Sequence, residues 1–155
     1  MSAFSKRLLD WHKHEGRKDL PWQKNITPYK VWISEIMLQQ TQVSTATPYF
    51  LKFIKRFPNV DSLANSTEDE VLSYWSGLGY YSRARNILKS AVLIKSEFQS
   101  KLPKSIEELV SLPGIGRSTA GAIRSIGYGL KAPILDGNVK RVLSRYFKIE
   151  EDLSK

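Results

Sequence analysis

Residues 105–141 give the strongest indication of the fold, and they read SIEELVSLPGIGRSTAGAIRSIGYGLKAPILDGNVKR. Ser105 is followed three positions later by Glu108 and then by apolar residues, which is the pattern of a capping box at the start of a helix. Pro113 ends this first helix, because proline lacks a backbone N–H and its ring clashes with the preceding turn. The stretch therefore opens with a short helix that has clear limits.

A glycine turn and a second helix follow. Gly114 and Gly116 form a tight turn that a residue with a Cβ would resist, and a helical pattern then runs from Arg117 to Ile126, before Gly127. Helix, Gly-x-Gly turn and helix predict a helix-hairpin-helix, whose backbone N–H groups can point at a phosphate. An ordinary two-helix corner is the alternative interpretation.

An acid lies downstream of the hairpin. Asp136 follows the short apolar run 133–135 and precedes GNVKR at 137–141. A carboxylate beside a phosphate-binding turn indicates chemistry on a nucleic acid. The run 133–135 is too short to found a sheet, and strand signals are almost absent elsewhere, so the pattern predicts an all-α fold of about eight helices.

The composition agrees with a polyanionic partner. Lysine and arginine number 24 against 15 acids, which gives a net charge of +9 and a pI near 9.8. The sequence has no cysteine, so disulfides, a thiolate nucleophile and thiolate metal ligands are excluded. No stretch approaches the roughly 20 apolar residues of a membrane span, and we expect a soluble intracellular protein.

One acid stands out upstream. Thr27 and Pro28 are typical of a helix start, and the helix 29–38 contains a single acid, Glu35. Its neighbours at helical spacing include Val31 and Trp32, and such surroundings raise a carboxyl pKa towards the range useful for a general acid. A surface glutamate at the edge of the apolar stripe is the alternative.

Two further segments combine polar and aromatic groups. Residues 39–42 supply three amides and a hydroxyl, which form either a polar turn or a set of donors and acceptors for base edges. Residues 77–81 form a glycine-rich turn with Tyr80 and Tyr81, which either belong to the core or wedge into a base stack. A basic helix over 82–98 follows, with Arg83, Arg85, Lys89 and Lys95 as its cations.

Glu35 and Asp136 together match hydrolysis of a glycosidic bond. One carboxyl protonates the leaving group, and the other stabilises the oxocarbenium-like sugar. If the leaving group is a nucleobase, the base must first leave the duplex. Hairpin amides for the phosphate, and amides and a tyrosine for the vacated stack, fit that requirement.

Three motifs in this order resemble a known family: Glu35 within SEIMLQQTQV, then LPGIGRSTAGAI, then ILDGNVKRV. Together they resemble the A/G-specific adenine DNA glycosylases, which are base-excision repair enzymes of the helix-hairpin-helix Gly/Pro-Asp superfamily and relatives of endonuclease III. The resemblance implies a six-helix barrel lobe over 27–132, with the helix-hairpin-helix at 105–127. Residues 1–26 and 133–155 would belong to a second, incomplete helical lobe.

The resemblance also implies a role for each matching residue. Family members remove adenine mispaired with 8-oxoguanine or guanine. Glu35 would be the general acid, Asp136 would stabilise the cationic sugar, and Asn138 would support Asp136. The remaining implied roles are duplex insertion by Gln40 and Tyr80, an adenine pocket lined by Leu20 and Trp22, and phosphate binding at Gly114, Gly116, Ser118 and Lys140.

Position 118 separates the relatives. Endonuclease III has a lysine there whose amine forms a Schiff base with the sugar, whereas Ser118 implies a monofunctional glycosylase without a strong lyase step. An endonuclease III-like pyrimidine glycosylase and lyase is the second hypothesis. A non-catalytic helix-hairpin-helix DNA-binding module, which would need neither acid, is the third.

The resemblance sets expectations for cofactors and partners too. Family members usually carry a 4Fe-4S cluster on four cysteines, which this sequence lacks, so we expect no cofactor and no metal site except a possible monovalent cation at the hairpin. The expected partner is double-stranded DNA with a mispaired adenine, bound by a monomer away from membranes. The expected compartment is the bacterial cytoplasm at the nucleoid, or the nucleus or mitochondrion in a eukaryote.

Overall fold

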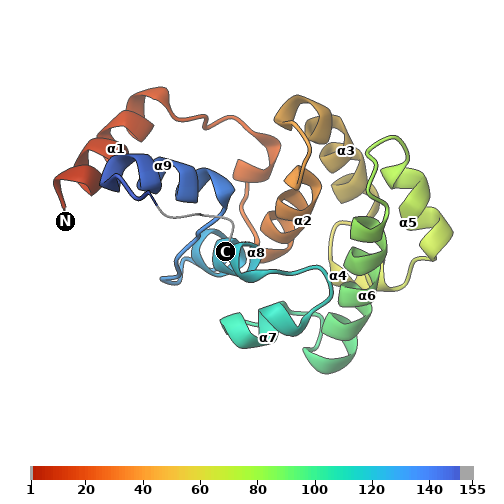
Figure 1. The fold of residues 1–155 in the computed structure, drawn as a ribbon. Coiled ribbons are helices and arrows are strands. Elements are labelled where there is room, and N and C mark those ends of the chain that lie inside the picture. Colours follow the sequence, from red (N-terminus) through yellow and green to blue (C-terminus); the bar gives the residue numbers. More distant parts are fainter. Residues whose placement is uncertain (1, 151–155) are drawn as a thin grey trace.

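The computed structural model describes residues 2–150, and these residues are helical without any strand (Figure 1). The all-α prediction is confirmed. Within the described part the helices are α1 (Ala3–Glu15), η1 (Pro21–Gln23), α2 (Pro28–Leu38), α3 (Val43–Arg56), α4 (Val60–Ala64), α5 (Glu68–Trp75), α6 (Ser82–Glu97), α7 (Ile106–Ser111), α8 (Arg117–Ala122), η2 (Ile123–Gly127) and α9 (Gly137–Phe147).

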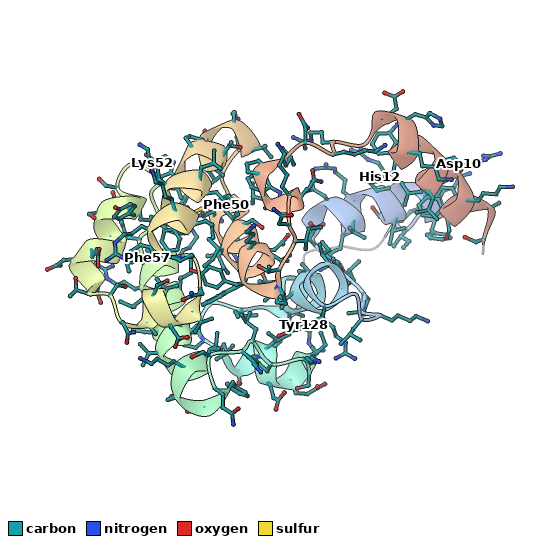
Figure 2. The ribbon with its side chains drawn as sticks, turned by 180° about the vertical axis from the view of Figure 1, so that it is seen from behind. Asp10, His12, Phe50, Lys52, Phe57 and Tyr128 are labelled. Carbon is teal, nitrogen blue, oxygen red and sulfur yellow. The ribbon has the colours of Figure 1, made fainter. Side chains whose placement is uncertain are left out.

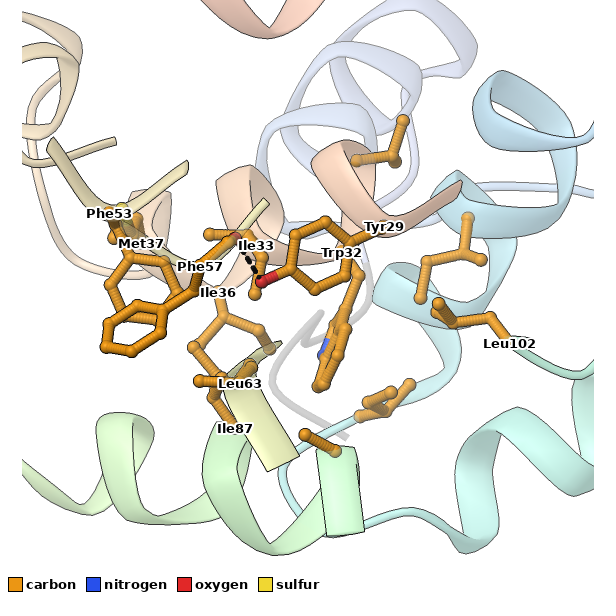
Figure 3. Close-up of a cluster of buried hydrophobic side chains, with 14 of the residues drawn as sticks. Tyr29, Trp32, Ile33, Ile36, Met37, Phe53, Phe57, Leu63, Ile87 and Leu102 are labelled. Carbon is orange, nitrogen blue, oxygen red and sulfur yellow. Dashed lines mark hydrogen bonds between the residues drawn. The ribbon is translucent and has the colours of Figure 1, made fainter. Parts of the chain in front are cut away.

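Helix α2 lies at the centre of the core and contacts α3, α6, α8 and η2. Most of its residues are buried, and Trp32, Ile33 and Met37 have no exposed surface. An α-helix that is apolar on nearly all sides is stable only when neighbours cover it. Tyr29 at its start donates a hydrogen bond of 2.8 Å to the Phe57 carbonyl, which fixes α2 against the end of α3 (Figure 3).

Aromatic side chains from α3 and α5 complete this core. Phe53 lies 4.8 Å from Phe57 and 6.1 Å from Trp75 between ring centroids, and all three are fully buried. Figure 2 shows Phe50 and Phe57 among the packed helices, while Asp10 and His12 lie on α1 at the far end of the molecule. Phe50, Phe53 and Phe57 are buried in the core, whereas the histidines of α1 are exposed.

Several helices start with a local cap, among them the two starts predicted at Thr27 and Ser105. The hydroxyls of Thr27, Thr67 and Ser105 each accept a hydrogen bond from the backbone N–H three residues later. At Ser105 the capping box is only half present. The Glu108 carboxylate accepts a 2.7 Å hydrogen bond from the Ser105 hydroxyl, where the box has it accept from the backbone N–H.

The second helix of the hairpin differs from the prediction. An α-helix was expected over 117–126, but α8 ends at Ala122 and continues as the π-helical segment η2. Its wider turn is marked by a 3.1 Å hydrogen bond from the Tyr128 N–H to the Ile123 carbonyl, five residues back. Apolar spacing alone does not distinguish the two helix types. Packing against α2 selects the wider turn, with Gly127 directly against Pro28.

Helices α1 and α9, from the two ends of the described chain, lie side by side (Figure 1). Phe4 packs on Tyr146 with 4.4 Å between ring centroids. The other large apolar residues of α1, Leu8, Leu9 and Trp11, are about half exposed. None of the helices within residues 2–150 is long and apolar enough to cross a membrane.

Candidate active site

A cleft of about 920 Å³ opens where α2, the turn after it, α8 and α9 meet. Five of the site residues predicted from the sequence line this cleft: Glu35, Gln40, Ser118, Asp136 and Asn138. They come from four segments spread over a hundred positions of the chain. The other lining residues are Leu38, Gln39, Thr41, Val43, Thr119 and Gly137.

Glu35 reaches the cleft from the last turn of α2 and is partly buried. Burial raises the pKa of its carboxyl, and the nearby charge of Asp136 raises it further. A raised pKa at Glu35 is what its apolar neighbours in the sequence predict. A carboxyl with a raised pKa keeps its proton closer to neutral pH and can therefore donate it to a leaving group.

Asp136 lines the same cleft and is the N-cap of α9. Its Oδ1 accepts a 2.8 Å hydrogen bond from the Val139 N–H, and the side chain is otherwise exposed to the cleft. This bond holds the carboxylate at the positive end of the helix dipole, where negative charge is favoured. Asn138 lines the same wall, but its Oδ1 accepts a 3.0 Å hydrogen bond from Arg141.

The return segment that carries Asp136 crosses α8 at very close range. Gly121 faces the Pro133 carbonyl so closely that a Cβ on residue 121 would collide with it. Gly121 therefore lets residues 133–136 approach α8 and deliver Asp136 to the cleft that Glu35 lines.

The prediction that the hairpin glycines resist a Cβ is confirmed at Gly114 and wrong at Gly116, where an added Cβ would meet nothing within 4 Å. Gly114 has a φ of +78°, the left-handed region that favours glycine, and Gly116 is the N-cap of α8. Ser118, two residues into the helix, lines both the cleft and an adjacent hollow of about 450 Å³. Lys140 lines that hollow and not the cleft with the two carboxyls, which agrees with a phosphate contact better than with a nucleophile.

Gln40 and Tyr80 stand on two exposed turns at the same side of α2. Both have left-handed backbones, with φ of +55° and +49°. Tyr80 is 62% exposed and Tyr81 is 41% exposed, so neither belongs to the core. Gln40 is among the cleft-lining residues, and Tyr80 lies outside them.

The predicted adenine pocket lies elsewhere. Leu20 and Trp22 are partly buried around η1, outside the set that lines the cleft. Trp22 packs edge-on against Phe50 with 5.5 Å between ring centroids. Contact with adenine stays a prediction for both residues.

Sequence reasoning missed the position of one residue beside the site. Arg83 was named only as a cation of the basic helix, yet it is buried, with 8% of its surface exposed. Its guanidinium donates to backbone oxygens of the turns that bear Gln40 and Tyr80. A signal was available, because Arg83 stands four residues before Ile87 and eight before Ala91, on the apolar stripe of α6.

Among residues 2–150, no group of three or more His, Asp or Glu side chains could hold a metal ion. The 155 residues contain no cysteine, so they supply no thiolate for an iron–sulfur cluster, and the residues present do not fit that group. A monovalent cation at the hairpin stays a prediction.

Two carboxyls of unlike environment lie in one cleft beside a helix-hairpin-helix, and paired carboxyls of this kind are what cleavage of a glycosidic bond requires. A family model described as HhH-GPD superfamily base excision DNA repair protein matches residues 33–155. The chain belongs to this superfamily.

Relatives named adenine DNA glycosylase confirm the resemblance that the motifs indicate. The chain is 60% identical over 147 residues to a protein named adenine DNA glycosylase from Buchnera aphidicola subsp. Baizongia pistaciae, covering 95% of this chain and 42% of that protein. It is 42% identical over 161 residues to one of the same name from Rattus norvegicus, covering 98% and 31%. The chain thus spans less than half the length of these relatives.

A solved structure shares the fold. The structure of a thermostable thymine-DNA glycosylase superposes with a TM-score of 0.87 at 26% identity, covering 93% of this chain and 66% of that one. The helix-hairpin-helix glycosylase fold predicted from the motifs is confirmed.

Proposed function

We propose that this chain hydrolyses the N-glycosidic bond of adenine mispaired with 8-oxoguanine or guanine in double-stranded DNA. The observation that carries the proposal is the meeting of Glu35 and Asp136 in one cleft, close enough for the charge of Asp136 to raise the pKa of Glu35. The relatives named adenine DNA glycosylase support the choice of base.

The two carboxyls have different roles in the reaction. Glu35 gives its proton to a ring nitrogen of the adenine as the bond from the base to C1′ breaks, and the bonding electrons leave with the base. Asp136, ionised, stabilises the positive charge that develops on the sugar. Water then adds to C1′, and its proton returns to Glu35, which leaves an abasic site and free adenine.

Ser118 supports a reaction that ends at the abasic site, without cleavage of the strand. An imine with the sugar requires an amine, and a serine hydroxyl at the hairpin position supplies none. Lys140 belongs to the neighbouring hollow and would hold a phosphate. The strand is therefore expected to stay intact until the abasic site is cleaved chemically.

Duplex binding would use the rest of the site. The hairpin and the net charge of +9 would hold the phosphate backbone, while Gln40 and Tyr80 enter the stack that the adenine leaves. We further propose that the chain acts as a monomer on DNA of the bacterial nucleoid, or of the nucleus or mitochondrion in a eukaryotic cell.

A single-turnover incubation with a duplex carrying adenine opposite 8-oxoguanine tests the proposal, with products resolved before and after alkaline cleavage. Breaks that appear only after alkali are the expected result. Breaks without alkali would favour a lyase. Duplex binding without any break, before or after alkali, would contradict the enzymatic proposal and favour a DNA-binding module.

A further inference from the structure

Arg83 is the only charged side chain that is buried within residues 2–150, and its partners are unusual. No carboxylate of the described chain forms a salt bridge with it. Its two terminal nitrogens donate instead to neutral oxygens: Nη1 to the carbonyls of Ile36, Met37 and Gln39 and the hydroxyl of Thr41, and Nη2 to the carbonyls of Leu78 and Gly79.

One end of the guanidinium closes the turn that bears Gln40. The Ile36 and Met37 carbonyls are among the last of α2, and each accepts from Nη1 at 3.0 Å. A cation there gives the Met37 carbonyl a donor and the Ile36 carbonyl a second one beside the Gln39 N–H at 3.3 Å, and it complements the negative end of the helix dipole. The same nitrogen reaches Gln39 and Thr41, on either side of Gln40.

The other end holds the turn that bears Tyr80. Nη2 donates to the Gly79 carbonyl at 3.2 Å, and the guanidinium lies 5.5 Å from the centre of the Tyr80 ring. Trp75 also supports this turn. Its Nε1 donates to the same Gly79 carbonyl at 3.0 Å, and its ring lies 5.4 Å from the guanidinium.

Both turns need such support. A left-handed backbone is unfavourable for a residue with a side chain, and it persists where the surroundings impose it. Gln40 and Tyr80 both have this conformation, and Arg83 donates to the residues on both sides of Gln40 and to Gly79 just before Tyr80.

We propose that Arg83 is a positioning residue that couples the two turns, and fixes the spacing at which Gln40 and Tyr80 enter a duplex together. The inference rests on the proposed function, because insertion has a use only if a base leaves the stack. The planar guanidinium presents donors in two directions at once. A lysine ammonium is a single point with three donors and cannot serve both turns.

Hydrogen–deuterium exchange of the free chain tests the coupling without DNA. Arg83→Lys is expected to speed exchange in both segments 38–42 and 77–81, by about tenfold or more, while α3 keeps its protection. The matched control is Arg85→Lys, two residues along α6, where the arginine makes an exposed 2.9 Å ion pair with Glu68. Faster exchange in one segment alone, or in neither, would overturn the proposal.

A milder variant covers the case in which Arg83→Lys unfolds the chain. Thr41→Val removes only the hydroxyl that accepts from Nη1 at 3.3 Å. If the guanidinium couples the turns, exchange should rise in 77–81 as well as in 38–42. A change confined to 38–42 would contradict coupling.

A duplex with 2-aminopurine in place of the mispaired adenine then tests insertion. This base is bright only when unstacked, so saturating protein should raise its fluorescence, and Arg83→Lys should reduce that rise severalfold while Arg85→Lys does not. In a Gln40→Ala, Tyr80→Ala background, Arg83→Lys should add little, because its effect passes through those side chains. A full additional loss there would refute the positioning role.

These readouts need no bond cleavage. A wild-type chain that unstacks the base but never releases adenine would contradict the proposed glycosylase and leave the role of Arg83 standing. If wild type releases adenine and Arg83→Lys changes neither that release nor the hydrogen–deuterium exchange, the proposed glycosylase stands and the role of Arg83 is contradicted.

Discussion

At the scale of single residues, the site depends on two carboxyls held in different surroundings. Glu35 is partly buried in the last turn of an apolar helix, and its pKa is raised by that burial and by Asp136. Asp136 is exposed and bonded to a backbone N–H at a helix start. Such differences allow one carboxyl to carry a proton while the other carries a charge.

The pH dependence of adenine release follows from the Glu35 pKa. Only protonated Glu35 can act as the acid, so the single-turnover rate should fall as pH rises through its raised pKa, by about tenfold per unit well above it. Rates measured between about pH 5 and 9 at saturating protein check this. A rate that stays flat or climbs over that range would contradict the role.

Stability should respond to the same group with a definite sign. Because the folded state binds the Glu35 proton more tightly than the unfolded state, the free energy of unfolding falls as pH rises above about 4.5, the ordinary value. Glu35→Gln should therefore be more stable than wild type at pH 7, and the difference should shrink towards pH 4. Urea unfolding at both pH values measures it, with exposed Glu97→Gln as the control. A less stable Glu35→Gln at pH 7 would contradict the inferred pKa direction.

At the scale of elements, the site is assembled where helices end and begin. Glu35 and Gln40 stand at the end of α2, Ser118 near the start of α8 and Asp136 at the start of α9. Helix ends expose backbone groups that can bind and orient ligands. The crossing of the return segment over α8 sets the distance between the two carboxyls.

The close approach at Gly121 makes that crossing testable. Gly121→Ala would push the Pro133 carbonyl away, and it should slow adenine release by about 100-fold while costing about 1–3 kcal/mol of stability. Ala122→Gly is the control, since it costs about 1 kcal/mol without crowding the segment. Equal rates in the two variants would show that Gly121 does not set the position of Asp136.

Local signals account for the elements that could be predicted from sequence. The caps at Thr27, Thr67 and Ser105 act within three residues, so their patterns are visible in any short window. The π-helical turn after Ala122 and the burial of Arg83 depend on partners tens of residues away. Sequence singled out Glu35 and Asp136 by the context of each acid, and the motif resemblance gave them their separate roles. Their meeting in one cleft could not be derived from spacing, because no spacing rule joins residues a hundred positions apart.

At the scale of the whole molecule, the net charge of +9 favours binding of a polyanion such as duplex DNA. Duplex affinity should therefore fall by about tenfold or more between about 50 and 200 mM salt. Lys140→Gln should reduce the slope of log affinity against log salt by about one, and Lys52→Gln on α3 should not. Fluorescence anisotropy at four salt concentrations would measure both. Equal slopes in the two variants would remove Lys140 from the interface.

The central claim is that Glu35 supplies the proton that releases adenine. Single-turnover release of free adenine should be compared between wild type and Glu35→Gln, with duplex affinity measured on the same samples. We expect the Glu35→Gln rate to fall by about 100-fold or more, with its duplex affinity within about threefold of wild type. Release at the wild-type rate by Glu35→Gln would contradict it.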